Sequence, residues 1–294
     1  MTLANIPLNP RLNPYKDGIA AAHLKGKVEA DNFVEGAHFQ INAPITGVYR
    51  DAADDAMLDT QALMGESFIV YDKIGDWSWG QLQDDKYVGW IQSRDLSDVH
   101  YGVTHKVGVL RTIVFSKPDL KTKPLYMLSL NSRVAVEEVQ GLFSKIVNGG
   151  WVFSDHLFNI GETYDDFVSV AEMFQDAPYL WGGKDSFGLD CSGLVQTSMA
   201  AVGIGVPRDA SMQETADILG QSIPFEDGID HLQRGDLVFW PGHVGIMQNN
   251  EFMLHANAHH MMCASEPVVE AIERIGQKET AVRTIKRPSQ LFQV

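Results

Sequence analysis

The chain has few cysteines, no long apolar run and no signal-like start, and each absence excludes a class of protein. Its 294 residues include two cysteines, Cys191 and Cys263. Two thiols do not make a disulfide framework, so a reducing compartment is expected. No stretch approaches the roughly 18 consecutive apolar residues of a membrane helix. The first residues lack the basic start and apolar run of a secretory signal. We therefore expect a soluble cytoplasmic protein without a membrane partner.

An excess of positive charge is also missing. The formal net charge is -15 at pH 7, so the phosphates of a nucleic acid would be repelled, whereas neutral or cationic substrates are tolerated. Net charge excludes a nucleic-acid partner but does not define a function.

Motifs for phosphates and metals are absent as well. The stretch Gly182–Lys184 lacks the preceding strand and the spacing of a Walker motif. The segment His255–Cys263 suggests zinc, because three histidines lie near a cysteine. However, it starts as a strand, and no Cys-x-x-Cys or His-Glu-x-x-His motif accompanies it. We expect His259, His260 and Cys263 to be loop or core residues, and we expect no metal and no cofactor.

The N-terminal half has the pattern of small β domains. Residues 1–38, with prolines at 7, 10 and 14, predict an irregular arm with one short helix near Ala20–Ala22. From 39 to 162, short β-type runs alternate with Gly, Asp and Asn turns, and one series of residues echoes another. The first series is Phe68–Tyr71, Trp79, Val88–Ile91 and Asp95–Leu96, and the second is Val134–Val136, Phe143, Gly149–Val152 and His156–Leu157. The echo predicts two small barrels, at 39–100 and 101–162; the alternative is one irregular β domain.

The pattern changes after Gly161. Apolar residues recur at helical spacing from Phe167 to Phe174, and again from Leu194 to Val202. Strand-like runs follow, at 237–240, 244–247 and 252–254. Helices followed by strands predict a compact α+β domain over 163–294.

Cys191 is the candidate nucleophile, because a glycine-rich turn leads into the second predicted helix at this position. A thiol at a helix N-terminus faces unpaired N–H groups and the positive end of the helix dipole, which favour the reactive thiolate. The same N–H groups suit the oxyanion of an acyl-transfer reaction. A buried structural cysteine is the alternative; the polar neighbours Asp190 and Ser192 favour the catalytic interpretation.

Two histidines flank a predicted hairpin and are candidates for the base and its orienting partner. We expect Met247 to face Glu251, which pairs Ile246 with Phe252 and His243 with His255. This register gathers the apolar side chains on one face and both histidines on the other, whereas a slip by one residue scrambles the faces. One imidazole would take the thiol proton while the other fixes its orientation.

At this point the sequence resembles the NlpC-type cell-wall peptidases, over about 130 residues. The motifs that carry the resemblance are Pro178–Gly183, Leu189–Val195, Val206–Gln213, Arg234–Trp240 and His243–Ile246. The resemblance implies a papain-like α+β domain with Cys191 as nucleophile, His243 as base and His255 as orienting residue. It further implies that Tyr179 lies beside the cysteine, near the oxyanion.

The N-terminal half is similar to a subgroup with two bacterial SH3-like barrels before the catalytic domain. Such peptidases cleave the γ-D-glutamyl bond to a diamino acid in murein peptides that carry a free N-terminal L-Ala. By this resemblance Asp190 would pair with the L-Ala ammonium. The further substrate contacts it suggests are Ser192, Ser211, Tyr87 and Asp51. The implied role is recycling of wall peptides, with a murein peptide as the binding partner; the oligomeric state and the diamino acid stay open.

Two other functions compete with this hypothesis. A non-catalytic murein-binding protein would have barrels of this kind, but it has no need of an activated thiol. A papain-like amidase or acyltransferase would share the chemistry and differ in substrate; an acidic group for a free amine favours the peptidase.

Overall fold

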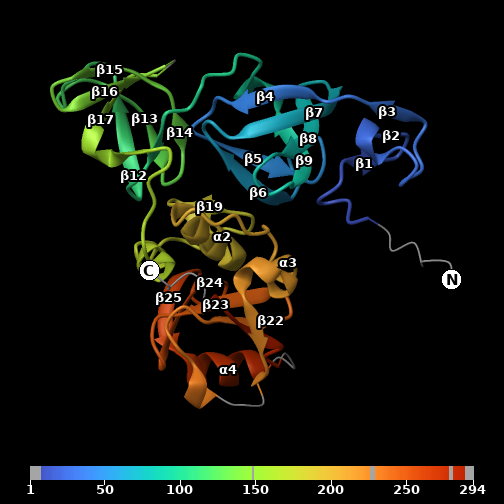
Figure 1. Cartoon of the computed structure of the whole chain (residues 1–294), viewed down its shortest axis with the longest axis vertical. Coiled ribbons are helices and arrows are strands. Elements are labelled where there is room, and N and C mark those ends of the chain that lie inside the picture. Colours follow the sequence, from blue (N-terminus) through green and yellow to red (C-terminus); the bar gives the residue numbers. More distant parts are fainter. Residues whose placement is uncertain (1–7, 148, 226–228, 278–280, 289–294) are drawn as a thin grey trace.

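The computed structural model describes residues 8–147, 149–225, 229–277 and 281–288, which form a small N-terminal sheet, two β domains and an α+β domain (Figure 1). The expected features that involve residues 1–7, such as Pro7, lie outside the described residues. Within the described residues, no helix is long and apolar enough to cross a membrane.

The N-terminal arm is more ordered than the sequence suggested. It contains a three-stranded sheet, β1 (Tyr15–Lys16), β2 (Ile19–Ala21) and β3 (Asn32–Val34), and β2 runs directly into one turn of 3-10 helix, η1 (Ala22–Leu24). Ala20, Ala21 and Leu24 are buried at its centre. The alanine run that suggested a helix is therefore mostly strand, because its side chains are needed as a small core.

The first β domain is one seven-stranded sheet of order β10-β4-β7-β8-β9-β5-β6. Its strands are β4 (Ala37–Ile41), β5 (Ile45–Tyr49), β6 (Leu58–Leu63), β7 (Ser67–Ile74), β8 (Trp77–Leu82), β9 (Val88–Gln92) and β10 (Leu96–Ser97). Alternate residues of these strands point inward, as in the strand β5, where Thr46 and Val48 are buried between partly exposed neighbours.

The second β domain repeats part of this plan in two sheets, of orders β13-β12-β17-β16-β15 and β14-β11-β18. Its strands are β11 (His105–Val107), β12 (Arg111–Phe115), β13 (Pro124–Ser129), β14 (Arg133–Val134), β15 (Val136–Gln140), β16 (Phe143–Ile146), β17 (Trp151–Phe153) and β18 (Leu157–Asn159). In both domains a strand is followed by one 3-10 turn and a short strand: η2 (Ser93–Asp95) leads to β10, and η3 (Ser154–His156) leads to β18. The sequence echo therefore corresponds to a repeated local structure.

In the α+β domain, three of the helices pack against a six-stranded sheet of order β21-β26-β22-β23-β24-β25. The helices are α1 (Phe167–Glu172), α2 (Cys191–Ala201), α3 (Ala210–Thr215) and α4 (Val268–Gly276). The strands of the sheet are β21 (Gln221–Ile223), β22 (Leu237–Trp240), β23 (His243–Met247), β24 (Phe252–Asn257), β25 (Met262–Pro267) and β26 (Thr284–Arg287), and a separate two-stranded ribbon joins β19 (Lys184–Asp185) to β20 (Gly188–Leu189). One face of the sheet packs with α1 and α2, and the other with α4.

The predicted register of the β23–β24 hairpin is wrong by two residues. The observed pairs are Ile246 with Leu254 and Met247 with Met253. The turn is longer than expected, because Asn249 Oδ1 accepts hydrogen bonds from the backbone N–H groups of Glu251 and Phe252, at 2.8 Å each. A shift by two preserves the faces, so the two histidines still lie on the same face, as diagonal neighbours.

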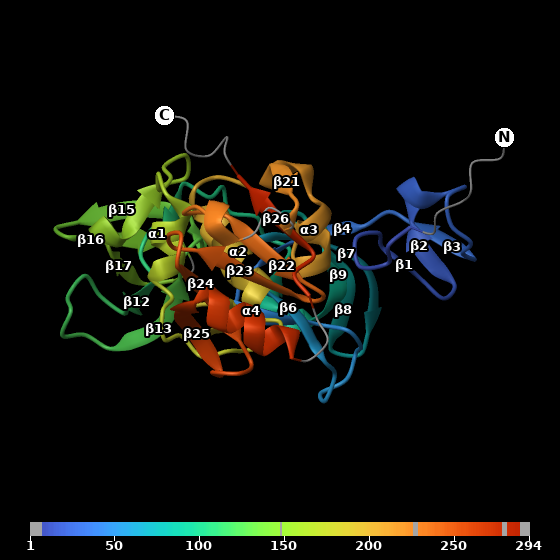
Figure 2. The ribbon, with the colours of Figure 1, turned by 90° about the horizontal axis from the view of Figure 1, so that it is seen from below.

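Both β domains lie on the same side of the α+β domain, next to α2 and β19, and α4 lies at the opposite end (Figure 1). Seen from below, the sheet of the N-terminal arm projects beyond the first β domain (Figure 2). The helix α2 is thus enclosed between the sheet of its own domain and the two β domains.

Candidate active site

Cys191 is the first residue of α2 and is buried. Asp190 caps the helix, accepting a hydrogen bond from the backbone N–H of Gly193 at 2.8 Å. Gly193 has no space for a side chain, because a Cβ there would lie 2.2 Å from the carbonyl oxygen of Gly183. The glycines on both sides therefore let the preceding loop approach the helix and hold the thiol at its N-terminus.

Burial favours the neutral form of the Cys191 thiol. Burial raises the pKa of Cys191 to about 12, Asp190 adds to this increase, and the backbone N–H groups of Val244 and Ser192 oppose it. The sequence analysis expected the helix terminus to favour thiolate; desolvation outweighs that effect here. A base must therefore remove the thiol proton during the reaction.

The candidate base is His243, at the start of β23. The two-residue turn Pro241-Gly242 precedes it, and Gly242 adopts a φ of 75° that favours glycine. Since the backbone N–H of the next residue, Val244, faces the Cys191 thiol, the imidazole and the thiol lie at the same end of the sheet. Burial, together with His255 and Arg274, lowers the pKa of His243 to about 3, so the imidazole is neutral and keeps a lone pair on one ring nitrogen.

A buried chain of hydrogen bonds determines which nitrogen of His243 is free. His243 Nε2 lies 2.8 Å from His255 Nδ1, and His255 Nε2 lies 2.6 Å from Glu266 Oε1. Burial opposes ionisation of Glu266, but hydrogen bonds from Arg274 and His255 outweigh it and lower the pKa of this carboxyl. An ionised carboxylate only accepts, so His255 Nε2 carries a hydrogen.

The position of this hydrogen determines the tautomers of the His255 and His243 rings. Burial lowers the pKa of His255, so its ring is neutral and its Nδ1 accepts a hydrogen bond from His243 Nε2. The neutral ring of His243 then has its lone pair on Nδ1. The carboxylate of Glu266 thereby leaves Nδ1 of His243 as the basic atom.

Asp190 belongs to a buried network. Its Oδ2 accepts from the backbone N–H of Gly182 at 2.8 Å and from Arg208 at 2.7 Å, and its Oδ1 accepts from Gly193, Ser192 and Arg208. A carboxylate has about four lone-pair sites, so these contacts leave none for a substrate ammonium. The charge of Asp190 is matched by Arg208, whose side chain is 1% exposed.

A small pocket opens at Cys191 between the first β domain and the α+β domain. Of the residues singled out from the sequence, it is lined by Tyr179, Asp190, Cys191, Ser192, Ser211 and Tyr87. Residues that the sequence analysis did not identify complete its wall: Arg11, Arg50, Asp59, Trp181, Arg208 and Asp209. The Val206–Gln213 motif was a signal for Arg208 and Asp209, whereas nothing in the sequence pointed to Arg11 or Asp59.

Asp51 does not reach this pocket. It is exposed in the turn after β5, and the acidic residue of this hairpin that lines the pocket is Asp59 on β6. Asp59 accepts a hydrogen bond from Arg50 at 2.6 Å. The choice of Asp51 is thus corrected to Asp59, because the strand and not the turn faces the α+β domain.

The histidine-rich segment 255–263 was a candidate for metal binding. Among the described residues, one group has suitable spacing, His255, His260 and Glu266. Arg274 and His255 already occupy the carboxylate of Glu266. Cys263 pairs with Ala256, next to the His255–Ala264 pair, so its side chain lies on the opposite face from His255 and cannot join these ligands.

Comparison with known proteins supports these features. Residues 176–274 match the NlpC/P60 family, and residues 48–96 match the bacterial dipeptidyl-peptidase SH3 domain. A γ-D-glutamyl-L-lysine dipeptidyl-peptidase of Bacillus cereus is 30% identical over 211 residues, which cover 62% of this chain and 60% of that protein. A protein of the same name from Bacillus subtilis is 27% identical over 69% of this chain and 73% of its own length.

Among solved structures, an NlpC/P60 family protein of Bacillus cereus superposes with a TM-score of 0.70 at 21% identity, covering 85% of this chain and 99% of that one. This likeness concerns the fold. The predicted fold class, a papain-like α+β domain after SH3-like β domains, is confirmed by these matches.

Proposed function

Because residues 176–274 match the NlpC/P60 family and residues 48–96 match a bacterial dipeptidyl-peptidase SH3 domain, we propose that this protein is a cysteine peptidase of cell-wall peptides. Its proposed reaction is hydrolysis of the γ-D-glutamyl bond to a diamino acid in peptides with a free N-terminal L-Ala. The observation that carries the proposal is the hydrogen-bonded series His243, His255 and Glu266, which orients an imidazole at the end of the sheet that the Cys191 thiol faces.

The reaction proceeds through a thioester. His243 Nδ1 takes the thiol proton as Cys191 Sγ attacks the γ-carbonyl carbon, and N–H groups at the start of α2 together with Tyr179 stabilise the oxyanion. The C–N bond breaks, and His243 returns the proton to the leaving amine. Water, deprotonated by His243, then attacks the thioester, releasing L-Ala-D-Glu and restoring the thiol.

The charges of the pocket suit the substrate. Three cations, Arg11, Arg50 and Arg208, line the pocket with three acids, Asp59, Asp190 and Asp209. A γ-linked L-Ala-D-Glu end carries an ammonium and an α-carboxylate, so a wall with both signs matches it. Since Asp190 has no free lone pair, the ammonium contact is assigned to Asp59 or Asp209.

Tyr87 closes the pocket beside Asp209. Its hydroxyl donates to Asp209 Oδ1 at 3.2 Å, and Arg11 donates to Asp209 Oδ2 at 2.6 Å.

A free L-Ala amine exists only on peptides released from the glycan strand. A cytoplasmic role in recycling such released peptides is therefore part of the proposal.

Mass spectrometry of L-Ala-γ-D-Glu-meso-diaminopimelate tests the proposal, beside the N-acetylated peptide and the Cys191→Ala variant. We expect L-Ala-D-Glu to be released from the free peptide alone and the variant to be inactive with an unchanged melting temperature. Cleavage of both peptides would keep the peptidase and remove the requirement for a free amine. Activity in Cys191→Ala, or no cleavage of either peptide, would contradict the proposal.

A further inference from the structure

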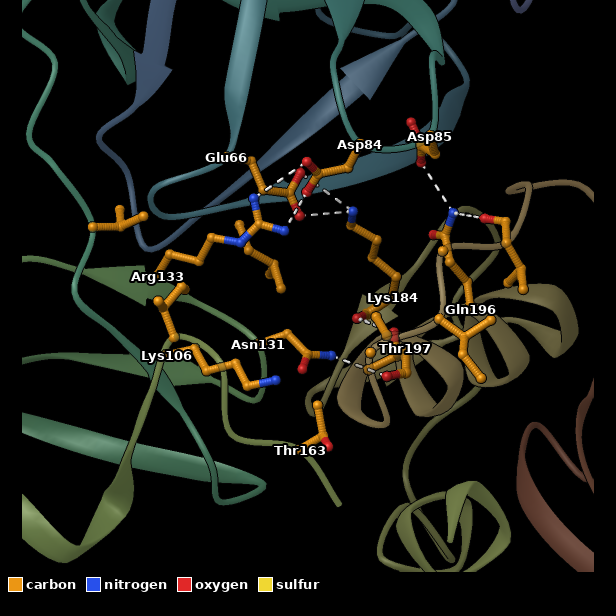
Figure 3. Close-up of a pocket in the computed structure, with 18 of the residues that line it drawn as sticks. Glu66, Asp84, Asp85, Lys106, Asn131, Arg133, Thr163, Lys184, Gln196 and Thr197 are labelled. Atoms are coloured by element: carbon orange, nitrogen blue, oxygen red, sulfur yellow. Dashed lines mark hydrogen bonds and ion pairs between the residues drawn. The ribbon is translucent and has the colours of Figure 1, made fainter. Parts of the chain in front are cut away.

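A second and larger cavity lies on the far side of α2 from the catalytic pocket. Its volume is about 640 Å³, within the usual range of roughly 300–1,000 Å³ for small-molecule sites. All three domains line it (Figure 3): Glu66, Asp84 and Asp85 come from the first β domain, Lys106, Asn131 and Arg133 from the second, and Lys184, Gln196 and Thr197 from the third. None of these residues lines the pocket of Cys191.

Most charges in this cavity already have a partner. Lys184 pairs with Glu66 at 3.0 Å, and Arg133 pairs with Asp84 at 2.7 Å. Asn131 donates to the carbonyl oxygen of Thr197 at 2.9 Å. These contacts hold the three domains together around the space and leave it open.

Lys106 on β11 is the exception among the cations. It is 9% exposed, its ammonium extends into the cavity (Figure 3), and no hydrogen bond or ion pair to another described residue satisfies it. The nearby Glu162 instead accepts from the backbone and side-chain N–H groups of Asn159, at 2.5 and 3.0 Å. Burial, and then Arg133, lower the pKa of Lys106. The ammonium therefore faces the cavity without an ion-pair partner among the described residues, and a ligand anion there would pair with it.

The opposite wall offers complementary groups. Asp85 accepts hydrogen bonds from the backbone N–H of Tyr87 and from Gln196 Nε2, both at 3.0 Å, but forms no ion pair with the described residues. Lys184 acts on this carboxylate electrostatically but forms its ion pair with Glu66. A carboxylate that lines the cavity without an ion pair fits a ligand ammonium.

We propose that this cavity binds a small zwitterion, namely an amino acid or short peptide with free ends. Its carboxylate pairs with Lys106, and its ammonium is held by Asp85. The proposal does not depend on the reaction at Cys191, because it rests on separate residues. The two sites share one helix: Cys191 begins α2, and Gln196, Thr197 and Ala200 face the cavity.

Calorimetric titration of the full chain with L-alanyl-L-alanine tests this site, with Lys106→Met as the variant. Methionine keeps much of the apolar stem and removes the ammonium. We expect Lys106→Met to weaken binding about tenfold or more. The matched control, Lys121→Met in an exposed loop, removes the same charge and should bind as the unmodified protein does. Propionate, which offers a carboxylate alone, should bind more weakly than the dipeptide.

Two further measurements separate a ligand site from a structural lysine. Without ligand, Lys106→Met should melt at the same temperature or higher, because it removes an uncompensated charge. Asp85→Asn keeps the acceptor for Tyr87 N–H and should weaken the dipeptide but not propionate. No binding of the dipeptide to the unmodified protein would overturn the proposal. So would equal binding by Lys106→Met, which would place the dipeptide elsewhere.

Discussion

In the proposed reaction, the nitrogen of His243 that accepts the thiol proton is selected by a carboxylate that does not touch His243. Glu266 contacts His255, and His255 contacts His243. Each hydrogen bond fixes the tautomer of the next ring, so the charge of Glu266 leaves the lone pair on Nδ1 of His243. Glu266 is therefore a positioning residue, and its removal should alter catalysis more than stability.

We expect Glu266→Gln to lower kcat about 100-fold, the usual scale of general-base catalysis. The amide can donate to His255 Nε2, which reverses both hydrogen bonds and places a hydrogen on Nδ1 of His243. Steady-state rates with the free peptide measure the effect. Glu273→Gln is the matched control, because Glu273 is an exposed acid on α4, the helix that follows the strand of Glu266.

Full activity in Glu266→Gln would show that the tautomer is set by other groups. A large loss of thermal stability in that variant, with kcat restored at low temperature, would assign Glu266 a purely structural role. Both measurements are made on the same preparation.

The loss of kcat/KM on the acid side of the pH profile should occur far below the ordinary pKa of histidine. Burial, His255 and Arg274 lower the pKa of His243 from 6.5 to about 3. The neutral base persists at every pH above its pKa and is lost only as pH falls through it. We therefore expect kcat/KM to show no histidine-like decrease as pH is lowered through about 6.5. A decrease in kcat/KM near that pH would mean that the imidazole that acts as base is more exposed to solvent than His243 is in this structure.

Single residues also show what a sequence can predict. Cys191, His243 and His255 were found because they sit in contiguous motifs with a recognisable order. Glu266 and Arg274 were not found, because only the pairing of β24 with β25 and the following helix α4 bring them to His255. Asp59 was missed in favour of Asp51 because the sequence does not show which part of a hairpin faces another domain.

At the scale of secondary structure, the β23–β24 hairpin shows how an error of register can be harmless. Hydrophobic matching identified the faces of both strands, because face depends on parity alone. It did not identify the length of the turn, which depends on the hydrogen bonds that Asn249 Oδ1 accepts from the backbone. The histidines are thus neighbours along a diagonal, and their contact at 2.8 Å survives the shift.

The N-terminal arm is an element with a direct part in the pocket. The carbonyl oxygen of Arg11 accepts from the backbone N–H of Val88 at 2.8 Å, and Leu12 accepts from Gln81. These bonds hold the arm on the first β domain, while the Arg11 side chain reaches Asp209 of the α+β domain.

We expect Arg11→Met to raise KM for the free peptide about fivefold with little change in kcat, since the Arg11 side chain is partly exposed and its ion pair is worth about 1 kcal/mol or less. Initial rates over a range of peptide concentrations provide the measurement. Arg94→Met on the same β domain, whose side chain is 80% exposed, is the control. An unchanged KM would mean that the N-terminal arm covers the first β domain without contributing to substrate binding.

At the scale of the whole molecule, a buried ion pair joins the first β domain to the α+β domain. The side chains of Lys184 and Glu66 are 9% and 8% exposed, and their charged atoms are 3.0 Å apart. Burial raises the pKa of Glu66. For Lys184, burial alone would lower the pKa, but Glu66, Asp85 and Asp84 together outweigh burial and raise it. Removing one partner leaves the other charge buried.

We expect Glu66→Gln to lower the free energy of unfolding by about 3 kcal/mol, the usual cost of breaking a buried pair. Denaturant titration measures it. Glu137→Gln, which breaks the exposed pair with Lys145 in the second β domain, should have little effect. The double variant Glu66→Met/Lys184→Met should recover most of the loss; if it does not, packing and not charge accounts for the effect.

The distribution of the catalytic pocket over the chain has a consequence for biosynthesis. Arg11 and Tyr87 are made early, Cys191 later, and His243, His255 and Glu266 later still. Domains fold from the N-terminus as they leave the ribosome, so the outer wall of the pocket can exist before the nucleophile is synthesised. The thiol, however, has no base until nearly the entire chain has emerged. If the proposed roles hold, the nascent protein has no thiol activity until its base, which is encoded after its nucleophile, has been synthesised.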